Sequence, residues 1–260
     1  MSVNRRAVIR LFVVVTAMSW LPTWAHAQIP VERPTPSAQR DFPSELACGV
    51  RATATRPAGT VRVGPGREHG KALFGPGDPV IVRGGTSQGL RVGQDYYVRR
   101  VTDDRFTELG SDGVPIISIR TAGWVRIVEA EAEASIASVT RACGGIQEGD
   151  YLEPFELPTV PAETANAGVP DFKNPGRLLL GDDRRQMGAT GDFMVFDRGS
   201  DHGLRNGQRL TIFRETADGK GPVSRVGEAT AMLVSPETTV VRIDRSLDAV
   251  YVGDLVAIHR

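Results

Sequence analysis

Residues Gly77–Arg100 read GDPVIVRGGTSQGLRVGQDYYVRR, and residues Gly191–Arg214 read GDFMVFDRGSDHGLRNGQRLTIFR. The two stretches align without a gap at a constant offset of 114, and nine of their 24 positions are identical. Turn residues repeated at a fixed spacing indicate two copies of one structural unit. The repeated positions that we expect to form turns, or to lie beside them, are Gly77, Asp78, Gly89, Leu90 and Gly93 in the first copy and Gly191, Asp192, Gly203, Leu204 and Gly207 in the second.

A second gapless alignment extends the repeat to its closing turn, because residues Gly123–Gly149 match Gly227–Gly253 at an offset of 104. Residues Glu129–Ile136 read EAEAEASI and have helical propensity on their own. The alignment places Ala132 opposite Pro236, and a proline in mid-segment argues against a helix there. We therefore expect strand and turn in both copies. Each copy closes on a Gly-Asp turn, Gly149-Asp150 in the first and Gly253-Asp254 in the second.

The composition favours an all-β fold with many short strands. The chain of 260 residues has 29 glycines and 17 prolines but only 6% aromatic residues. Val80–Val82 is β-branched, and Tyr96–Val101 alternates with a period of two. Each repeat spans only about 80 to 95 residues. A sheet this small must curl to bury one face and protect its edges, so we expect two tandem small β-barrels or tight sandwiches.

The repeat also sets the expected domain boundaries. We place the first barrel at residues 61–156 and the second, which lacks an insertion found after Arg100, at 177–260. The proline-rich residues 28–60 have no apolar period, so we expect an irregular, extended N-terminal segment. Residues 157–176, with prolines and small polar side chains, have the composition of a linker.

Residues 1–27 have the pattern of a signal peptide. Arg5, Arg6 and Arg10 form a positive region, and an apolar run of eleven follows. Residues Ala25–Ala27 supply a small-x-small cleavage site. Eleven apolar residues are too few to cross a bilayer, which takes about 20; the alternative is a buried N-terminal helix. Because the arginine pair also resembles a twin-arginine signal, the export route stays open between that and the general route.

The charge of the exported chain bears on its partners. Removing residues 1–27 leaves 28 basic and 31 acidic side chains, a net charge of −3. We therefore expect no nucleic-acid partner and no binding to an anionic membrane surface. No second apolar run is long enough to cross a membrane, so we expect no transmembrane segment after signal removal. The expected location is the periplasm or outer-membrane periphery of a Gram-negative bacterium, or the extracellular medium.

Two cysteines, Cys48 and Cys143, lie in the exported part, and such a pair predicts a disulfide. A metal site would need histidines nearby, and a reactive thiol would need a base. Closing a loop of about 100 residues stabilises by at most about 4.7 kcal/mol in the chain-entropy model. Cys143 falls opposite Leu247 of the second repeat, so we expect its side chain to point into the first barrel. Reduction should then loosen the first repeat and leave the second unchanged.

The sequence carries no recognised catalytic or nucleotide-binding motif. Beyond the signal peptide the histidines are His69, His202 and His259. His202 follows Asp201, but its counterpart in the first repeat is Gln88, and adjacency in a loop does not make a catalytic triad. No Gly-x-Ser-x-Gly, His-Glu-x-x-His, Walker-type or Gly-x-Gly-x-x-Gly sequence is present. We therefore expect a protein that is not an enzyme and has no catalytic, cofactor-binding or metal-binding residues.

The aspartate of each repeated Gly-Asp pair has two interpretations. Carboxylates bind calcium, but none of these four has a second carboxylate two or four residues further on. A role in capping the turn is therefore favoured. The repeated Arg91 and Arg205 are candidates for contact with an anionic ligand, although a solvated side chain or a local ion pair is favoured for both.

The order Gly-Asp, Gly-x-x-x-Gly-Leu-x-x-Gly, a strand ending in arginine and a closing Gly-Asp-x-Leu resembles the repeats of bacterial exported envelope proteins. It looks like the small β-barrel domains that follow LysM modules, and it is distantly similar to the C-terminal domain of flagellar assembly protein T. The resemblance covers Val61–Phe155 and Arg177–Arg260 and implies tandem envelope barrels. No LysM motif is present, so peptidoglycan binding by that module does not carry over, and no functional residue does either.

These features predict a non-catalytic binding or scaffold module of the cell envelope that contacts a cell-wall polymer or an envelope protein. The alternative is an accessory component of a polysaccharide-export or secretion assembly. Periplasmic proteins of polysaccharide export are similar in that their domains open on Gly-Pro-Gly-Asp, as at Gly75–Asp78. The same tetrad suits any tight turn before a strand.

Overall fold

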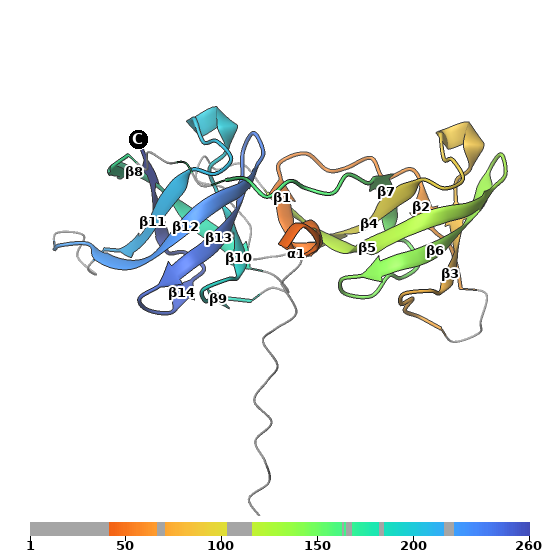
Figure 1. Cartoon of the computed structure of the whole chain (residues 1–260), viewed down its shortest axis with the longest axis horizontal. Coiled ribbons are helices and arrows are strands. Elements are labelled where there is room, and N and C mark those ends of the chain that lie inside the picture. Colours follow the sequence, from red (N-terminus) through yellow and green to blue (C-terminus); the bar gives the residue numbers. More distant parts are fainter. Residues whose placement is uncertain are drawn as a thin grey trace, which may run out of the picture. The chain divides into compact units, whose positions relative to one another are not determined.

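The structure is a computed structural model that describes residues 42–66, 71–102, 116–162, 164, 168–181, 185–215 and 221–260 (Figure 1). All of these residues belong to one compact unit, Arg40–Arg260. The predicted signal peptide, most of the insertion after Arg100, and His69 lie outside the described residues.

The first repeat forms a closed barrel of six antiparallel strands. The strands are joined in the ring order β5-β4-β7-β2-β3-β6, and β6 returns to β5. A further strand, β1, pairs with β5 outside this ring. The strands are β1 (Arg51–Thr53), β2 (Arg62–Val63), β3 (Pro79–Arg83), β4 (Asp95–Thr102), β5 (Ile117–Ala130), β6 (Ala134–Ala142) and β7 (Tyr151–Pro154).

The second repeat forms a closed barrel with the corresponding order β12-β11-β15-β8-β10-β13. A separate two-stranded sheet joins β9 to β14. The strands are β8 (Pro170–Gly181), β9 (Met187–Gly188), β10 (Phe193–Phe196), β11 (Arg209–Arg214), β12 (Ser224–Val234), β13 (Thr239–Ser246), β14 (Val250–Tyr251) and β15 (Leu255–His259). The prediction of two tandem all-β barrels is confirmed.

Corresponding backbone hydrogen bonds recur in both barrels at the offsets of the sequence repeat. The N–H of Gly77 donates to Val139 O at 2.8 Å, and that of Gly191 donates to Ile243 O at 2.7 Å. The bond from Gly93 to Ile127 matches that from Gly207 to Ala231 at the same offsets. The bond from Val63 to Asp150 matches that from Leu178 to Asp254, with the donors 115 residues apart because the lead-in to the second repeat is one residue shorter. The gapless alignments therefore identify structurally equivalent residues, and we use them below to compare the barrels position by position.

Each barrel encloses its own hydrophobic core, which follows from the alternation of side chains along the strands. In β3, Val80 and Val82 are buried and Arg83 is exposed. Leu90 and Leu204, each placed between glycines, are 3% and 2% exposed and pack into the two cores. Burying a side chain of this size stabilises by roughly 1.5–3 kcal/mol.

The segment with helical propensity, Glu129–Ile136, is strand and turn as the repeat predicts. Strand β5 ends at Ala130 and β6 begins at Ala134. The short 3-10 helix η1 (Thr86–Gln88) packs on this turn, where Thr86 N–H donates to Glu131 O at 2.8 Å. The equivalent helix η3 (Ser200–His202) packs on the turn between β12 and β13 in the same way, through a bond from Ser200 to Ser235.

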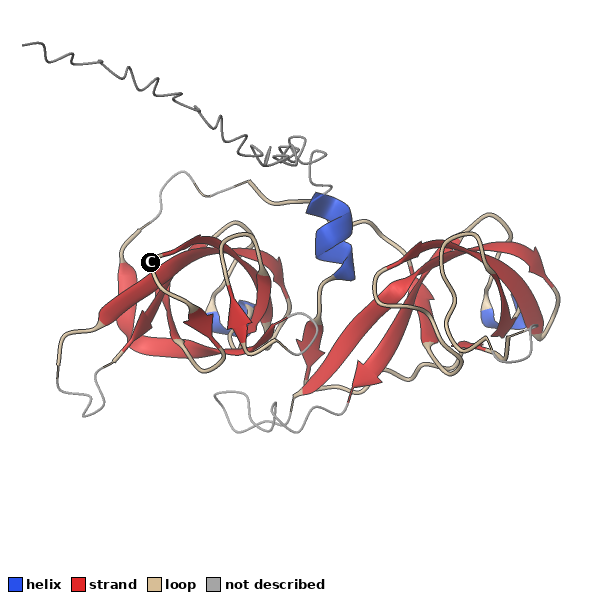
Figure 2. Cartoon of the chain, turned by 90° about the horizontal axis from the view of Figure 1, so that it is seen from below, coloured by secondary structure: helices blue, strands red, loops and turns tan. Residues whose placement is uncertain are grey.

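Two segments expected to be irregular contain regular structure (Figure 2). The proline-rich segment includes helix α1 (Phe42–Cys48) and strand β1, because tertiary contacts bury the small apolar face of α1. The predicted linker is also corrected, since β8 starts at Pro170 and pairs with β15. Proline is tolerated there because Pro170 is the first strand residue, and Pro175 lies within a register shift where the pairing is interrupted.

Candidate functional site

The four repeated aspartates cap their own turns. In each turn a carboxylate oxygen accepts a hydrogen bond from the backbone N–H three residues earlier, at 2.7 to 2.9 Å. For Asp78, the hydrogen bond from Lys71 and then that from the Gly75 N–H hold the pKa of the carboxyl below its ordinary value. These contacts give the aspartates the turn-capping role rather than that of calcium ligands.

The glycines of the repeat adopt backbone angles that other residues rarely take. Eight have φ between +80° and +94°, and they are Gly77, Gly89, Gly93, Gly149, Gly191, Gly203, Gly207 and Gly253. Glycine is required at these turns because a Cβ strains the left-handed region. The repeated turn positions that the sequence singles out therefore build the barrels.

His202, the most conspicuous histidine, has a structural contact that its counterpart shares. Its Nδ1 accepts a hydrogen bond from the Gly199 N–H at 3.3 Å. In the first barrel Gln88 Oε1 accepts the equivalent bond from Gly85 at 2.7 Å. The histidine thus caps its loop as the glutamine does.

Cys48 and Cys143 form a disulfide with a Cα–Cα distance of 5.5 Å, as predicted. The prediction that Cys143 points into the barrel is wrong. Its side chain packs against an outer aromatic cluster that includes Tyr97 and Trp124. Its counterpart Leu247 is 54% exposed. Ala142 is the neighbour that contacts the core, so Cys143 faces the other side of the strand.

An arginine–aspartate pair recurs in both barrels and joins two parts of the sequence pattern. Arg100 Nε lies 2.7 Å from Asp150 Oδ1, and its Nη2 lies 2.8 Å from Oδ2. Arg214 makes the same bidentate contact with Asp254, at 2.6 and 2.8 Å. The arginine that ends one strand thereby fixes the Gly-Asp turn that closes the repeat.

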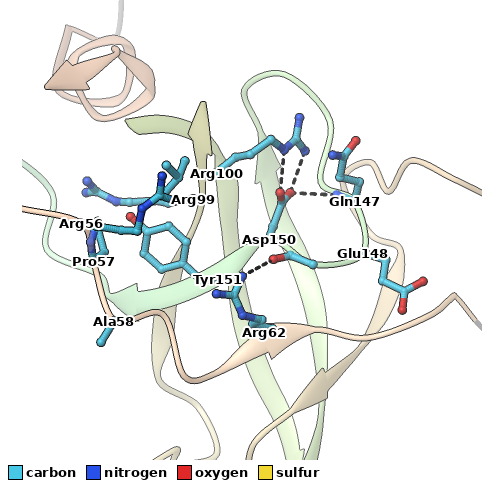
Figure 3. Close-up of a pocket in the computed structure, with 12 residues that line it drawn as sticks. Arg56, Pro57, Ala58, Arg62, Arg99, Arg100, Gln147, Glu148, Asp150 and Tyr151 are labelled. Atoms are coloured by element: carbon cyan, nitrogen blue, oxygen red, sulfur yellow. Dashed lines mark hydrogen bonds and ion pairs between the residues drawn. The ribbon is translucent and has the colours of Figure 1, made fainter. Parts of the chain in front are cut away.

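A pocket of about 410 Å³ opens beside this pair in the first barrel. Four arginines line it, together with Glu148, Asp150 and Tyr151. The arginines are Arg56, Arg62, Arg99 and Arg100, and we call the site the arginine pocket. In Figure 3 the segment carrying Arg56 and the turn carrying Glu148 lie on opposite sides, with the Tyr151 ring between them. The lining carries a formal charge of +2 from four arginines and two carboxylates.

Three polar residues beside this pocket occupy positions that are apolar in the second barrel. Strand pairing sets residue 99 opposite 151 in β4 and β7, and 213 opposite 255 in β11 and β15. Residues 153 and 257 come two positions after 151 and 255 on the same strands, so their side chains lie on the same faces. The polar trio is Arg99, Tyr151 and Glu153, and the apolar trio is Phe213, Leu255 and Ala257.

Two donors of the polar trio, Arg99 Nε and Tyr151 OH, are buried beside the Glu153 carboxylate, and neither makes a hydrogen bond of good geometry among the described residues. Arg99 Nε lies 3.2 Å from Glu153 Oε2, an ion-pair contact that lacks hydrogen-bond geometry. A buried polar group without a partner costs about 1–3 kcal/mol. Burial, and then the nearby Glu153, raises the pKa of Tyr151, so its hydroxyl stays protonated at neutral pH.

A further guanidinium, that of Arg51, interacts electrostatically with all three residues of the polar trio. Burial, followed by repulsion from Arg99, lowers the pKa of Arg51. The Arg99 guanidinium also stacks on the Tyr97 ring, 4.3 Å from its centroid. Around the buried part of the site, Arg51 and Arg99 therefore share one nearby carboxylate, Glu153.

The sequence analysis did not identify the polar trio or Arg56 and Arg62. The repeat alignment contained a signal, because identical turns enclose unlike residues at the three trio positions. Arg91 and Arg205 are exposed. Within the part of the chain that the structure describes, no group of three or more His, Cys, Asp or Glu residues could hold a metal ion.

Comparison with protein-family models and with curated proteins finds no match for this chain. Among the described residues, no helix combines the length and apolar character needed to cross a membrane.

Proposed function

We propose that this chain is a non-catalytic binding module of the bacterial cell envelope and that the first barrel holds its ligand or partner at the arginine pocket. The observation that carries the proposal is the polar trio. The second barrel builds the same strand pairing with an apolar trio, so the polar side chains are not needed to form the barrel. A buried ion pair is often no more stabilising than apolar residues of similar size. Binding of a ligand or partner would explain why the first barrel has the polar trio.

The lining of the arginine pocket supports binding rather than catalysis. Guanidinium groups remain protonated far above neutral pH and do not exchange protons in a reaction cycle. The carboxylates that line the pocket are held in ion pairs, Asp150 with Arg100 and Glu148 with Arg83.

The envelope setting rests on the signal-peptide pattern, the disulfide and the resemblance of the repeats. A cell-wall polymer or an envelope protein is the partner class. An accessory role in polysaccharide export or secretion is the alternative, and it rests on Gly75–Asp78. Those residues form a turn in which Asp78 N–H donates to Gly75 O at 3.1 Å, so the tetrad has a structural explanation.

The test is capture of the full chain on purified peptidoglycan and from envelope extract, beside the variant Arg99→Phe/Tyr151→Leu/Glu153→Ala. We expect the variant to fold, because the second barrel folds with the same trio and because Arg51 loses the repulsion of Arg99 together with the attraction of Glu153; the free energy of unfolding should change by no more than about 4 kcal/mol in either direction. The variant should lose capture. Failure of the wild type on both materials would overturn the binding proposal, and equal capture by a folded variant would remove the pocket from it.

A further inference from the structure

Building on the proposed function, we propose that the ligand presents a doubly charged oxyanion, either a phosphate monoester or two neighbouring carboxylates, to the arginine pocket. The inference combines the charge of the lining, the buried donors of the polar trio, and the apolar trio that replaces them in the second barrel.

The charge of the pocket matches a dianion. The lining has a formal charge of +2, and the neighbouring charges of Arg51 and Glu153 offset each other. Glu148 is also paired with Arg83 outside the lining, at 2.7 Å, so the charge around the pocket is at least +2. A phosphate monoester carries about −1.5 to −2 at neutral pH. Guanidinium groups are planar forks that bind phosphate and carboxylate through paired hydrogen bonds. Four of them around one pocket suit an oxyanion better than a neutral sugar or a cation.

The two buried donors of the polar trio have one acceptor beside them, the Glu153 carboxylate, and neither bonds to it with good geometry, so a further acceptor would satisfy them. Arg99 Nε–H can only donate, and the protonated Tyr151 hydroxyl can donate as well. Both side chains line the arginine pocket and are 3% exposed. An oxyanion has several acceptor lone pairs and no donor, so it complements this surface, whereas a ligand rich in donors would leave it unsatisfied.

The second barrel shows what the same place looks like without a ligand site. Phe172 packs edge-on against Phe213 of the apolar trio, with centroids 4.9 Å apart. Tyr251 stands where the first barrel has Gln147, and Arg214 lies 4.8 Å from its ring centroid. Aromatic side chains thus pack on this part of the second barrel, where the first barrel has Arg99 and Gln147.

The barrels provide a matched pair of arginines for the experiment. Arg62 Nη1 donates to Gly149 O at 2.9 Å, and Arg177 Nη1 donates to Gly253 O at 3.3 Å. Both side chains therefore hold the closing turn of their repeat. Arg62 lines the arginine pocket, whereas Arg177 belongs to the second barrel.

The experiment is calorimetric titration of the full chain with inorganic phosphate, malonate and acetate at low salt and about pH 8, where phosphate is mainly a dianion. We expect phosphate or malonate to bind at least about tenfold more tightly than acetate, and added sodium chloride to weaken binding. If phosphate binds more tightly than malonate, the ligand group is a phosphate monoester; the opposite order indicates two neighbouring carboxylates. Equal affinity for all three, or no binding of any, would overturn the inference.

The variants Arg62→Ser and Arg177→Ser complete the test. Arg62→Ser should weaken binding of the dianion by about tenfold or more, which corresponds to about 1.4 kcal/mol, and Arg177→Ser should leave it unchanged. Equal weakening in both would indicate a general charge effect and overturn the inference. Capture on peptidoglycan that depends on the polar trio, without dianion binding, would refute the ligand class and keep the proposed function. Binding of the dianion without capture that depends on the polar trio would support the ligand class and refute the proposed function.

Discussion

At the scale of single residues, the two barrels solve one packing problem in two ways. The second barrel buries Phe213 against Leu255, and the first buries Arg99 against Tyr151 at the same register. The apolar pair buries no polar side-chain atom, whereas the polar pair buries a Tyr151 hydroxyl whose contact with Glu153 lacks good hydrogen-bond geometry. The polar pair is therefore the place where stability and function conflict.

Replacing Tyr151 with Phe should leave the free energy of unfolding unchanged or raise it by about 1 kcal/mol, because the lost hydroxyl is buried and its contact with Glu153 lacks good hydrogen-bond geometry. The matched control is Tyr97→Phe. Tyr97 donates a hydrogen bond to Glu156 O at 2.8 Å, so this change should lower the free energy of unfolding by about 1 kcal/mol. Urea unfolding measures both. A larger loss for Tyr151→Phe than for Tyr97→Phe would contradict the assignment.

The same tyrosines should make the protein sensitive to alkali. Burial raises the pKa of Tyr97 and, with Glu153 adding to it, of Tyr151. The unfolded state then releases these protons first, near pH 10. Their contribution is present in full below about pH 10 and is lost as pH rises toward the folded pKa values. Urea midpoints should fall above about pH 10, and more gently in Tyr151→Phe; identical slopes would refute the cause.

At the scale of elements, each barrel depends on a short helix packed on a hairpin turn. In the first barrel Thr86 and Ser87 donate to the carbonyls of Glu131 and Ala132 at 2.8 and 3.1 Å. A Cβ at Gly85 would stand 2.0 Å from Glu131 O, so only glycine permits this approach. At Gly89 there is open space, and the constraint is the φ of +87°.

Alanine substitutions should distinguish the steric constraint at Gly85 from the backbone-angle constraint at Gly89. Gly89→Ala should cost about 1–2 kcal/mol, the usual penalty of the left-handed region. Gly85→Ala should cost more, about 3 kcal/mol, because backbone must move and the helix loses its contacts with the turn. Gly144→Ala is the control, since a Cβ there meets nothing within 4 Å. The measurement is thermal unfolding of the three variants. A larger drop in melting temperature for Gly89→Ala than for Gly85→Ala would contradict this account.

At the scale of the whole molecule, the segment of α1 and β1 contacts residues of both barrels. Cys48 is bonded to Cys143 of the first barrel. Leu46, 1% exposed, packs with residues of the second, and Thr238 donates a hydrogen bond to Ala52 O at 2.6 Å. The partners of Leu46 are Phe193, Met232 and Val240. The disulfide therefore holds a segment that both barrels use.

Removing the disulfide by Cys48→Ser/Cys143→Ser should lower the free energy of unfolding by about 2–5 kcal/mol. The contacts of Leu46 change the expectation drawn from the sequence, in which the second repeat is unaffected. We now expect faster amide hydrogen exchange in β13, which includes Val240, as well as around Cys143. Unchanged exchange in β13 would restore the earlier expectation, and the variant Leu46→Ala tests the same contact with the disulfide intact.

The sequence by itself determined the local architecture. Gly77, Asp78, Gly89 and their counterparts fix turns through backbone angles and short-range hydrogen bonds, which depend on residues a few positions apart. Once the turns are fixed, alternating apolar residues determine which face of each strand is buried. Repetition of the pattern then predicted two barrels, and two cysteines after a signal-peptide pattern predicted the disulfide.

Only the tertiary structure decided the rest, because it depends on residues far apart in the chain. The helix α1 and the start of β8 are stabilised by distant partners that override proline-rich composition. The direction of Cys143 depends on a strand irregularity that local patterns do not reveal. The arginine pocket brings residues 56, 62, 99 and 151 together through strand pairing across the barrel. These residues are not at a recognisable spacing in the sequence, so no motif predicts the binding site.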